Sequence, residues 1–387
     1  MNKLRWMLTA AFLAMAAITG LRAFAQITPN HEDFKSIPPN KWIKYHQPLS
    51  LDWRRQQHSG IAYDSKRGNF YLFGSDTHGK NWDNRVHEFN PTTKSWHSHY
   101  PIAPLETYRA DDRGRAIAGG GKLIPWAMHT FDNILYDPEL DAIVVSALPE
   151  HNRAAKKRVP TATSHPTWVY KIATHTWEIL ENKQSPSPKF FAAASAFDSN
   201  RNTLVAYRWG LWELGPERAV WQKALAQSHH KIHFNMEYDS VNKKLAVFGD
   251  HRNSNSVWVY TPGATAGSPG SWEENFPAGD VCPRDQHFPV AFDQKNAVFL
   301  LVPDNNRAIT NKNGKTVLKA NSSSTFVYDL AKNMYLKLPN ADLPTLGMNY
   351  MMVYDKFGEV FFLVTGNHKS PPTVWVLRLD LDNIPQV

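Results

Sequence analysis

Apolar and polar residues alternate along this chain in short stretches, and one arrangement of them recurs six times. Each copy is an apolar stretch that ends in a bulky aromatic residue and Asp, then a polar turn, then a second apolar stretch. The aromatic–Asp pairs are Tyr63-Asp64, Tyr136-Asp137, Phe197-Asp198, Tyr238-Asp239, Phe292-Asp293 and Tyr354-Asp355. Short apolar stretches bounded by Gly, Pro, Asn and Asp predict β-strands, and a long repeat predicts one supersecondary unit used many times.

The clearest copy predicts four strands. Segments 58–64 and 69–74 flank a turn at 65–68, and 85–89 is followed by a turn at 90–94 and a strand that begins at Ser95. Four such strands form an antiparallel meander, the unit of one propeller blade. A helical period of apolar residues is absent from the sequence, so we predict an all-β fold.

The two ends of the repeat region complement each other. The last copy ends near residues 374–379 without room for a fourth strand, and 42–45 precedes the first copy as an isolated strand. Pairing these segments would close a ring and leave no exposed sheet edge. We therefore predict a ring of six blades closed by the N-terminal strand. Seven blades are the alternative, because the long stretch 100–128 could contain further strands.

Two strand entries carry a family resemblance. Pro283 to His287, which precede Phe292-Asp293, and Arg55 to His58, which lead to the strand ending at Gly74, resemble the kelch repeat. The resemblance spans about residues 40–380 and implies a kelch-type β-propeller, the fold that galactose oxidase also contains. Copper chemistry of the galactose oxidase kind is not expected, because Cys282 lacks the sequence context of the Tyr–Cys crosslink.

The first 25 residues have the features of a secretory signal peptide. Lys3 and Arg5 are followed by an apolar stretch at 6–18 and by a small-x-small site that ends at Ala25. We expect cleavage after Ala25, a secreted or periplasmic protein, and one propeller domain over 26–387. No later stretch is long and apolar enough for a membrane span, so we expect no membrane insertion.

The net charge limits the kinds of partner that we expect, and the cysteine content limits the possible crosslinks. The net charge of +8 falls when the basic signal segment is removed. This moderate positive charge favours anionic partners but lacks the basic clustering of a nucleic-acid-binding protein, so we expect no nucleic acid. Cys282 is the only cysteine, so no intrachain disulfide can form, and a buried free thiol is the simplest interpretation. We expect a monomer.

The hairpin pattern predicts which side chains share one face. In a hairpin, the start of the first strand lies beside the end of the second, so each copy contributes one pair to the same face. The pairs are His58 with His78, His129 with His151, Phe190 with Arg208, His233 with His251, His287 with Asn305, and Tyr350 with His368. The alternative is structural: the repeat can copy a histidine that only caps a blade, as at His58, His233 and His287.

Two basic segments could form a rim around that face. One contains Arg109 and Arg113, and the other spans residues 153–158. Because guanidinium groups bind carboxylates and sulfates through two parallel hydrogen bonds, we expect an anionic ligand. Solvated surface charge is the alternative.

A second resemblance suggests a reaction. The sequence is similar to secreted ulvan-lyase-like propellers, in which a His pair, a Tyr and an Arg act together. His129 and His151 match the His pair, Arg208 matches the Arg, and Phe190 or Phe191 stands at the Tyr position. The resemblance implies β-elimination on a uronate polysaccharide, with Tyr207, Tyr350 or His58 replacing the missing Tyr. The predicted catalytic residues are His129, His151, Arg208 and Tyr207. The predicted substrate-binding residues are His58, His78, Arg109, Arg113, His251, His287 and Tyr350.

Two alternatives to catalysis remain at this point. One is a non-catalytic propeller that binds a glycan or a protein on the same face. The other adds a divalent metal, zinc or calcium, held by His58, His78, His129 or their neighbours, which would require at least three converging ligands.

Overall fold

The computed structural model describes residues 32–77, 82–147, 153–164, 166–180, 191–250, 254–310, 316–367 and 369–384. Their helical content is limited to α2 (Glu32–Lys35), α3 (Arg153–Arg158) and the 3-10 turns η1 (Leu105–Thr107) and η3 (Leu381–Asn383). The all-β prediction is confirmed. Among these residues no helix combines the length and apolarity needed to cross a bilayer. The predicted signal peptide lies outside them.

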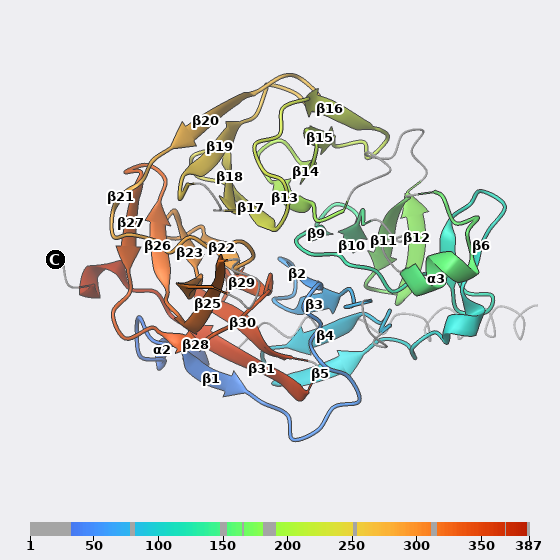
Figure 1. Cartoon of the computed structure of the whole chain (residues 1–387), viewed down its shortest axis with the longest axis horizontal. Helices are drawn as coiled ribbons and strands as arrows, with labels where there is room; N and C mark the ends of the chain where they lie inside the picture. Colours follow the sequence, from blue (N-terminus) through green and yellow to red (C-terminus); the bar gives the residue numbers. More distant parts are fainter. Residues whose placement is uncertain are drawn as a thin grey trace, which may run out of the picture.

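Six sheets of mainly antiparallel strands, drawn around a common centre in Figure 1, form the body of the described part of the protein. The first two contain β2 (Gly60–Tyr63), β3 (Phe70–Phe73), β4 (His87–Asn90) and β5 (Ser95–Ser98), and β9 (Ile134–Asp137), β10 (Ala142–Val145), β11 (Thr167–Lys171) and β12 (Thr176–Leu180). The next two contain β13 (Ala194–Asp198), β14 (Thr203–Tyr207), β15 (Leu211–Leu214) and β16 (Trp221–Leu225), and β17 (Phe234–Asp239), β18 (Lys244–Gly249), β19 (Val257–Thr261) and β20 (Ser271–Asn275).

The last two sheets depart from this simple order. The fifth contains β22 (Val290–Asp293), β23 (Val298–Leu301), β26 (Phe326–Asp329), β27 (Met334–Lys337) and β21 (Ala278–Gly279), the last pairing in parallel. The sixth contains β29 (Met352–Asp355), β30 (Val360–Asn367), β31 (Ser370–Leu377) and β1 (Ile43–His46). Ile43 pairs with Val376, so the predicted pairing of the N-terminal strand with the last copy is confirmed.

The first strand of each sheet lies beside the first strands of two other sheets. β2 contacts β9, β9 contacts β13, β13 contacts β17, β17 contacts β22, β22 contacts β29, and β29 contacts β2. These strands lie nearest the centre in Figure 1, and the later strands lie outside them. The residues just before the first strands are therefore brought together from distant parts of the sequence.

The repeated Asp explains why each hairpin turns where it does. Asp64 is fully buried, and its Oδ1 accepts hydrogen bonds from the backbone N–H groups of Lys66 (2.8 Å) and Arg67 (3.1 Å). The aspartates of the other five copies make the equivalent bonds two and three residues onward, as at Asp137, Asp198, Asp239, Asp293 and Asp355. A buried carboxylate thus bonds the backbone amides of each turn and fixes its shape.

The aromatic residue before the Asp connects neighbouring sheets. The hydroxyl of Tyr63, at the end of β2, donates to Asp355 Oδ1 of the sixth sheet at 2.5 Å. Tyr238, at the same position in the fourth sheet, donates to Asn200 Oδ1 of the third at 2.8 Å. The aromatic–Asp pair therefore stabilises both the turn and the contact between sheets.

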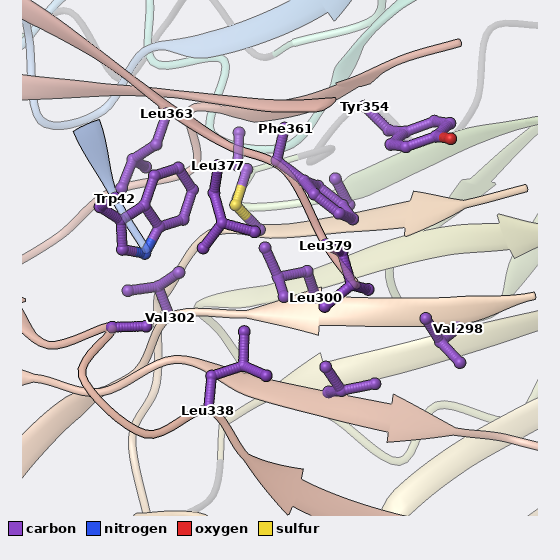
Figure 2. Packing of buried hydrophobic residues seen from close by; sticks show 14 of the residues in the cluster. Trp42, Val298, Leu300, Val302, Leu338, Tyr354, Phe361, Leu363, Leu377 and Leu379 are labelled. Atoms are coloured by element: carbon purple, nitrogen blue, oxygen red, sulfur yellow. The ribbon is translucent and has the colours of Figure 1, made fainter. Parts of the chain in front are cut away.

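Apolar side chains fill the spaces between sheets. Figure 2 shows the cluster between the fifth and sixth sheets, where Leu300, Leu338, Phe361 and Leu377 are buried. Trp42, just before β1, lies in the same cluster, and its Nε1 donates to Thr325 Oγ1 at 2.8 Å. Burying one such side chain contributes about 1.5–3 kcal/mol, so Trp42 holds the N-terminal segment firmly in place.

The long stretch 100–128 contains strands, as the sequence left open, but in a separate unit. β6 (Arg109–Ala110), β7 (Ala116–Ala118) and β8 (Ile124–Pro125) form a small antiparallel sheet, and β8 contacts β12. In Figure 1, β6 lies beyond β12, far from the centre. A second small sheet contains β24 (Asp304–Thr310), β25 (Thr316–Ser323) and β28 (Leu343–Pro344).

Candidate functional site

Side chains that precede the first strands of all six sheets gather in what we call the histidine cluster. Its members are linked by ring contacts and hydrogen bonds, and they are His58, His129, Phe131, Phe191, His233, His287 and Tyr350. The hairpin argument predicts this convergence, and the structure confirms it for the described residues.

Two imidazoles are stacked at one side of the cluster. The rings of His58 and His129 are 4.1 Å apart between centroids and 11° apart in plane. Their backbones are tied together, because Thr130 N and Phe131 N both donate to His58 O at 3.0 Å. This approach requires glycine at residue 60: a Cβ there would lie 2.1 Å from Phe131 O.

The end of the first hairpin supplies polar partners for both rings. Asp76 Oδ1 lies 3.3 Å from His58 Nδ1. Thr77 N donates to His129 Nε2 at 3.2 Å, and Thr77 Oγ1 is 3.1 Å from the same nitrogen. Because Nε2 accepts this amide hydrogen, the neutral His129 ring carries its proton on Nδ1. The lone pair of Nε2 is therefore engaged by Thr77, and His129 can act as a base or a metal ligand through Nε2 only when this bond is released.

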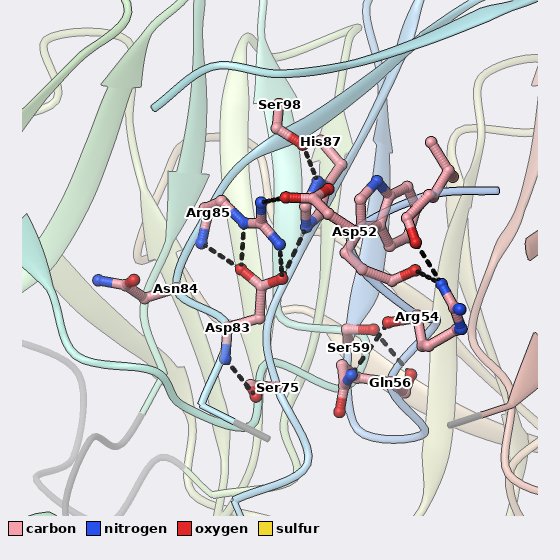
Figure 3. A network of polar contacts seen from close by, with 12 residues as sticks. Asp52, Arg54, Gln56, Ser59, Ser75, Asp83, Asn84, Arg85, His87 and Ser98 are labelled. Carbon is pink, nitrogen blue, oxygen red and sulfur yellow. Dashed lines mark hydrogen bonds and ion pairs between the residues drawn. The ribbon is translucent and has the colours of Figure 1, made fainter. Parts of the chain in front are cut away.

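The segments that carry Asp76 and His58 are held by a network of polar contacts, shown in Figure 3, that includes their neighbours Ser75 and Ser59. Asp83 accepts two hydrogen bonds from the Arg85 guanidinium, at 2.9 and 2.7 Å, and its amide donates to Ser75 Oγ at 3.2 Å. Burial opposes ionisation of Asp83, but bonds from His87 and Arg85 outweigh it and hold the pKa of this carboxyl well below its usual range. The network thus keeps its charge at neutral pH.

A tyrosine and a histidine meet at the other side of the cluster. The hydroxyl of Tyr350 lies 3.1 Å from His233 Nδ1, and the Phe131 ring contacts both rings. His287 packs edge-on against His233, with centroids 5.2 Å apart. Burial first, then the carboxylates of Asp132 and Asp285, raise the pKa of Tyr350 well above its usual value, so the phenol stays protonated.

Arg208 is linked to this His–Tyr pair through Asp250. It follows β14, and its guanidinium stacks over the Trp209 ring at 4.2 Å. Burial lowers the pKa of Arg208, and the opposing charge of Asp250 limits the change. Asp250 N in turn donates to His233 O at 3.0 Å, which connects the arginine to the cluster.

Three predicted site residues lie elsewhere. Tyr207 is fully buried, and its hydroxyl accepts the amide hydrogen of His229 at 2.7 Å, so it belongs to the core. Arg109 and Arg113 lie in and just after β6 of the small outer sheet, which Figure 1 places away from the centre. The predicted residues His78, His151 and His251, and Phe190 at the expected Tyr position, lie outside the described residues.

Sequence reasoning missed two carboxyl groups that line a cavity next to Tyr350 of the histidine cluster. Asp132 and Glu237 line a cavity of about 230 Å³ between the first strands, together with Tyr350. Burial raises the pKa of Glu237 to about 8, and burial followed by the Glu237 charge raises that of Asp132. Met236 N donates to Asp132 Oδ2 at 2.8 Å. The available signal is a charged residue between two apolar residues, Met236 and Tyr238, in the first strand of its copy.

The comparisons with known proteins identify no family. No family model and no curated protein matches the sequence. Among solved structures, a structural genomics protein of unknown function from Bacteroides thetaiotaomicron is similar, with a TM-score of 0.47 and 9% identity. The similarity covers 86% of this chain and 72% of that one.

Proposed function

We propose that the six sheets are the blades of a kelch-type β-propeller. The support is the succession of contacts between first strands, in which β2 neighbours both β9 and β29. The pairing of β1 with β31 supplies the closing strand, and Tyr63 bonds to Asp355 across the same junction. Six blades are favoured over seven, because the stretch 100–128 forms a small side sheet.

We propose further that the protein is secreted after cleavage at Ala25 and acts on an acidic polysaccharide as a uronate-specific lyase. The observation that carries this proposal is the hydrogen bond between Tyr350 and His233 beside the stacked pair of His58 and His129. It supplies a phenol where Phe190 and Phe191 lack one, and places it among imidazoles that can exchange protons near neutral pH.

The proposed reaction is β-elimination. Arg208 binds the uronate carboxylate and withdraws its charge, which acidifies the adjacent C–H bond. His129 exchanges the bond from Thr77 to its Nε2 for the substrate and takes the C5 proton, and the C4–O bond breaks as the C4–C5 double bond forms. Tyr350 or His151 gives a proton to the departing glycosidic oxygen. The products are a shortened chain and an unsaturated uronate. One proton is taken from C5 and one is given to the leaving oxygen, which keeps the electron pair of the C4–O bond.

The test is ultraviolet absorbance of the unsaturated uronate, measured with purified protein 26–387 and a panel of alginate, pectate, ulvan and chondroitin sulfate. We expect absorbance to rise with at least one polymer, and to be lost in His129→Ala, Arg208→Ala and Tyr350→Phe. His175→Ala, in a second stacked pair with His99, is the matched control and should keep activity. Full activity in all three cluster variants would overturn the site.

A binding propeller without catalysis is the second candidate, and burial favours it. His129 and Tyr350 are only 1% and 2% exposed, whereas Phe191, His233 and His287 keep more open surface. A ligand would then rest on the exposed rings without reaching the buried ones. Retention of the protein on an immobilised acidic polymer that it fails to cleave would support this function over the lyase.

We propose a divalent metal as an alternative occupant of the same site, with His129 as a ligand and not as a base. His58, Asp76 and His129 each offer one ligand atom, and these atoms lie within 4.8 Å of one another. An ion equidistant from three such atoms would lie about 2.8 Å from each, so shifts of under ~1 Å give bond lengths suited to zinc. Two imidazole nitrogens favour zinc over calcium, which prefers oxygen ligands.

A further inference from the structure

One buried arginine, remote from any carboxylate partner, stands out in the molecule. The side chain of Arg55 is 2% exposed; its Nε donates to Gly366 O at 2.7 Å and its Nη1 to Met348 O at 3.2 Å. Neither carbonyl neutralises the charge, and Nη2 makes no hydrogen bond to any described residue. Burial alone lowers the pKa of Arg55 to about 10, a value at which it remains a cation in neutral solution.

Two other buried arginines of the described chain form ion pairs. Arg218 forms an ion pair with Asp137 at 2.6 Å, and Arg85 forms one with Asp83 at 2.7 Å. A buried charge without an opposite charge is costly, and proteins rarely keep one without a use for it. An anion bound beside Arg55 would therefore offset the cost of this buried charge and stabilise the folded protein.

Arg55 lines an open cleft of about 350 Å³. The cleft lies between the 343–347 segment and the hairpin of β30 and β31, and its described polar and aromatic lining is Arg55, Gln57, Thr345, Thr365, Asn367 and Trp375. No Asp or Glu is among the described lining residues. Gln57, Thr345 and Asn367 are exposed, so a ligand can reach them from solvent.

The lining has the chemistry of a site for an acidic sugar. A guanidinium group binds a carboxylate through two parallel bonds, and amide and hydroxyl side chains bind ring hydroxyls. The Trp375 ring is held by its Nε1, which donates to Thr365 Oγ1 at 2.9 Å, and it offers a flat apolar surface to the C–H face of a sugar. The volume suits one small ligand better than a protein segment.

We propose that this cleft binds one carboxylate-bearing sugar residue, with Arg55 on its carboxylate and Trp375 against its ring. The site is separate from the histidine cluster and holds whether or not the protein cleaves a polymer. Because Arg55 precedes His58 by three residues, an acidic chain bound in the cleft could extend toward the cluster.

The test is isothermal titration calorimetry of the whole mature protein with glucuronate, galacturonate and glucose. A monosaccharide has no glycosidic bond to eliminate, so the result is independent of lyase activity. We expect glucuronate or galacturonate to bind and glucose to bind at least about 10-fold more weakly. Arg55→Gln should weaken uronate binding about 10-fold or more, whereas His175→Ala, in the separate stacked pair with His99, should leave it unchanged.

Rim variants keep the test decisive if Arg55→Gln does not fold. Gln57→Ala and Asn367→Ala change exposed side chains, and each should weaken uronate binding a few-fold, with Glu178→Gln on β12 as an unaffected control. Equal binding of glucose and uronate, or unchanged binding in both rim variants, would overturn the proposal. Binding of inorganic sulfate without uronate would also overturn it, by reducing the cleft to a simple anion site.

Discussion

The imidazole of His58 lies flat against that of His129, 4.1 Å away, although the two residues precede strands of different sheets. Protonating both rings would bring two like charges together, which is unfavourable at this distance. Asp76, 3.3 Å from His58, can compensate one positive charge. The two rings and the carboxylate can therefore accommodate one added positive charge. It is either one extra proton or one metal ion that also binds the carboxylate.

Metal binding by this pair is the first prediction. We expect the purified protein to bind about one equivalent of zinc, and Co²⁺ to give visible absorption bands of a low-symmetry N/O site. His58→Ala and Asp76→Asn should each lower zinc affinity at least about 10-fold, measured by competition with a chromogenic chelator.

The control for metal binding is a second histidine pair. His99 and His175 are also stacked, 4.0 Å apart, but both ring nitrogens of His99 are engaged, with Tyr170 and Glu88. His175→Ala should therefore leave zinc affinity unchanged. Equal loss in His175→Ala and His58→Ala, or no loss in either cluster variant, would contradict the assigned ligands.

The carboxyl group of Glu237 predicts a loss of stability at alkaline pH. Burial raises its pKa in the folded protein to about 8, whereas an unfolded glutamate titrates near 4.3. The folded state therefore binds more protons between these values, so stability falls as pH rises from about 4 to 8. Glu237→Gln cannot ionise, and its Tm should exceed that of the wild type by ~3 °C or more at pH 9.

The pH dependence distinguishes this effect from simple repacking. At pH 4.5 the wild-type carboxyl is protonated in the folded state and roughly half protonated in the unfolded state, so its ionisation costs little stability, and Glu237→Gln and the wild type should have nearly equal Tm values. Glu178→Gln, at an exposed position on β12, should behave like the wild type at both pH values. A Tm difference of the same size at pH 4.5 and pH 9 would contradict the titration of Glu237.

The repeat and its consequences were accessible from sequence, because they depend on local chemistry. Aromatic–Asp pairs predict hairpins, since a short carboxylate can bond amides two and three residues away, as Asp64 does. The pairing of the N-terminal strand followed from a missing strand in the last copy and is confirmed. The meeting of His58, His129 and His233 followed from the geometry of hairpins.

What the sequence could not show depends on contacts between distant residues. Tyr207 belongs to the core because its hydroxyl accepts the amide hydrogen of His229, which lies 22 residues further along the chain. Arg55 bonds to the backbone carbonyls of Gly366 and Met348. Every residue has a backbone carbonyl, so the sequence cannot show which of them an arginine contacts. Glu237 gains its raised pKa from burial in a cavity that exists only when the first strands meet.

A buried ion pair predicts a large loss of stability. Arg218 bonds to both oxygens of Asp137, at 2.6 and 3.1 Å, and both side chains are at most 4% exposed. Arg218→Ala leaves a buried carboxylate unpaired and should lower the free energy of unfolding by about 3–5 kcal/mol, measured by urea denaturation. Lys295→Ala, which removes the exposed pair with Glu359, should cost at most ~1 kcal/mol.

The contact between Tyr63 and Asp355 tests the junction between the first and last sheets. The phenol donates to a buried, ionised carboxylate, and burial followed by the Asp355 charge raises the pKa of Tyr63, so the donor stays protonated. Hydrogen bonds to charged groups contribute about 1.5–3 kcal/mol, so Tyr63→Phe should lower the free energy of unfolding by this amount. Tyr328→Phe is the control, because the Tyr328 hydroxyl donates to the neutral amide oxygen of Asn333 at 3.0 Å. It should cost only about 0.5–1.5 kcal/mol.

If the six sheets form one closed ring, Tyr63→Phe should lower the urea midpoint of a single transition without separating it into two. A biphasic curve, with the first and sixth sheets unfolding before the rest, would show instead that the ring is not one cooperative unit.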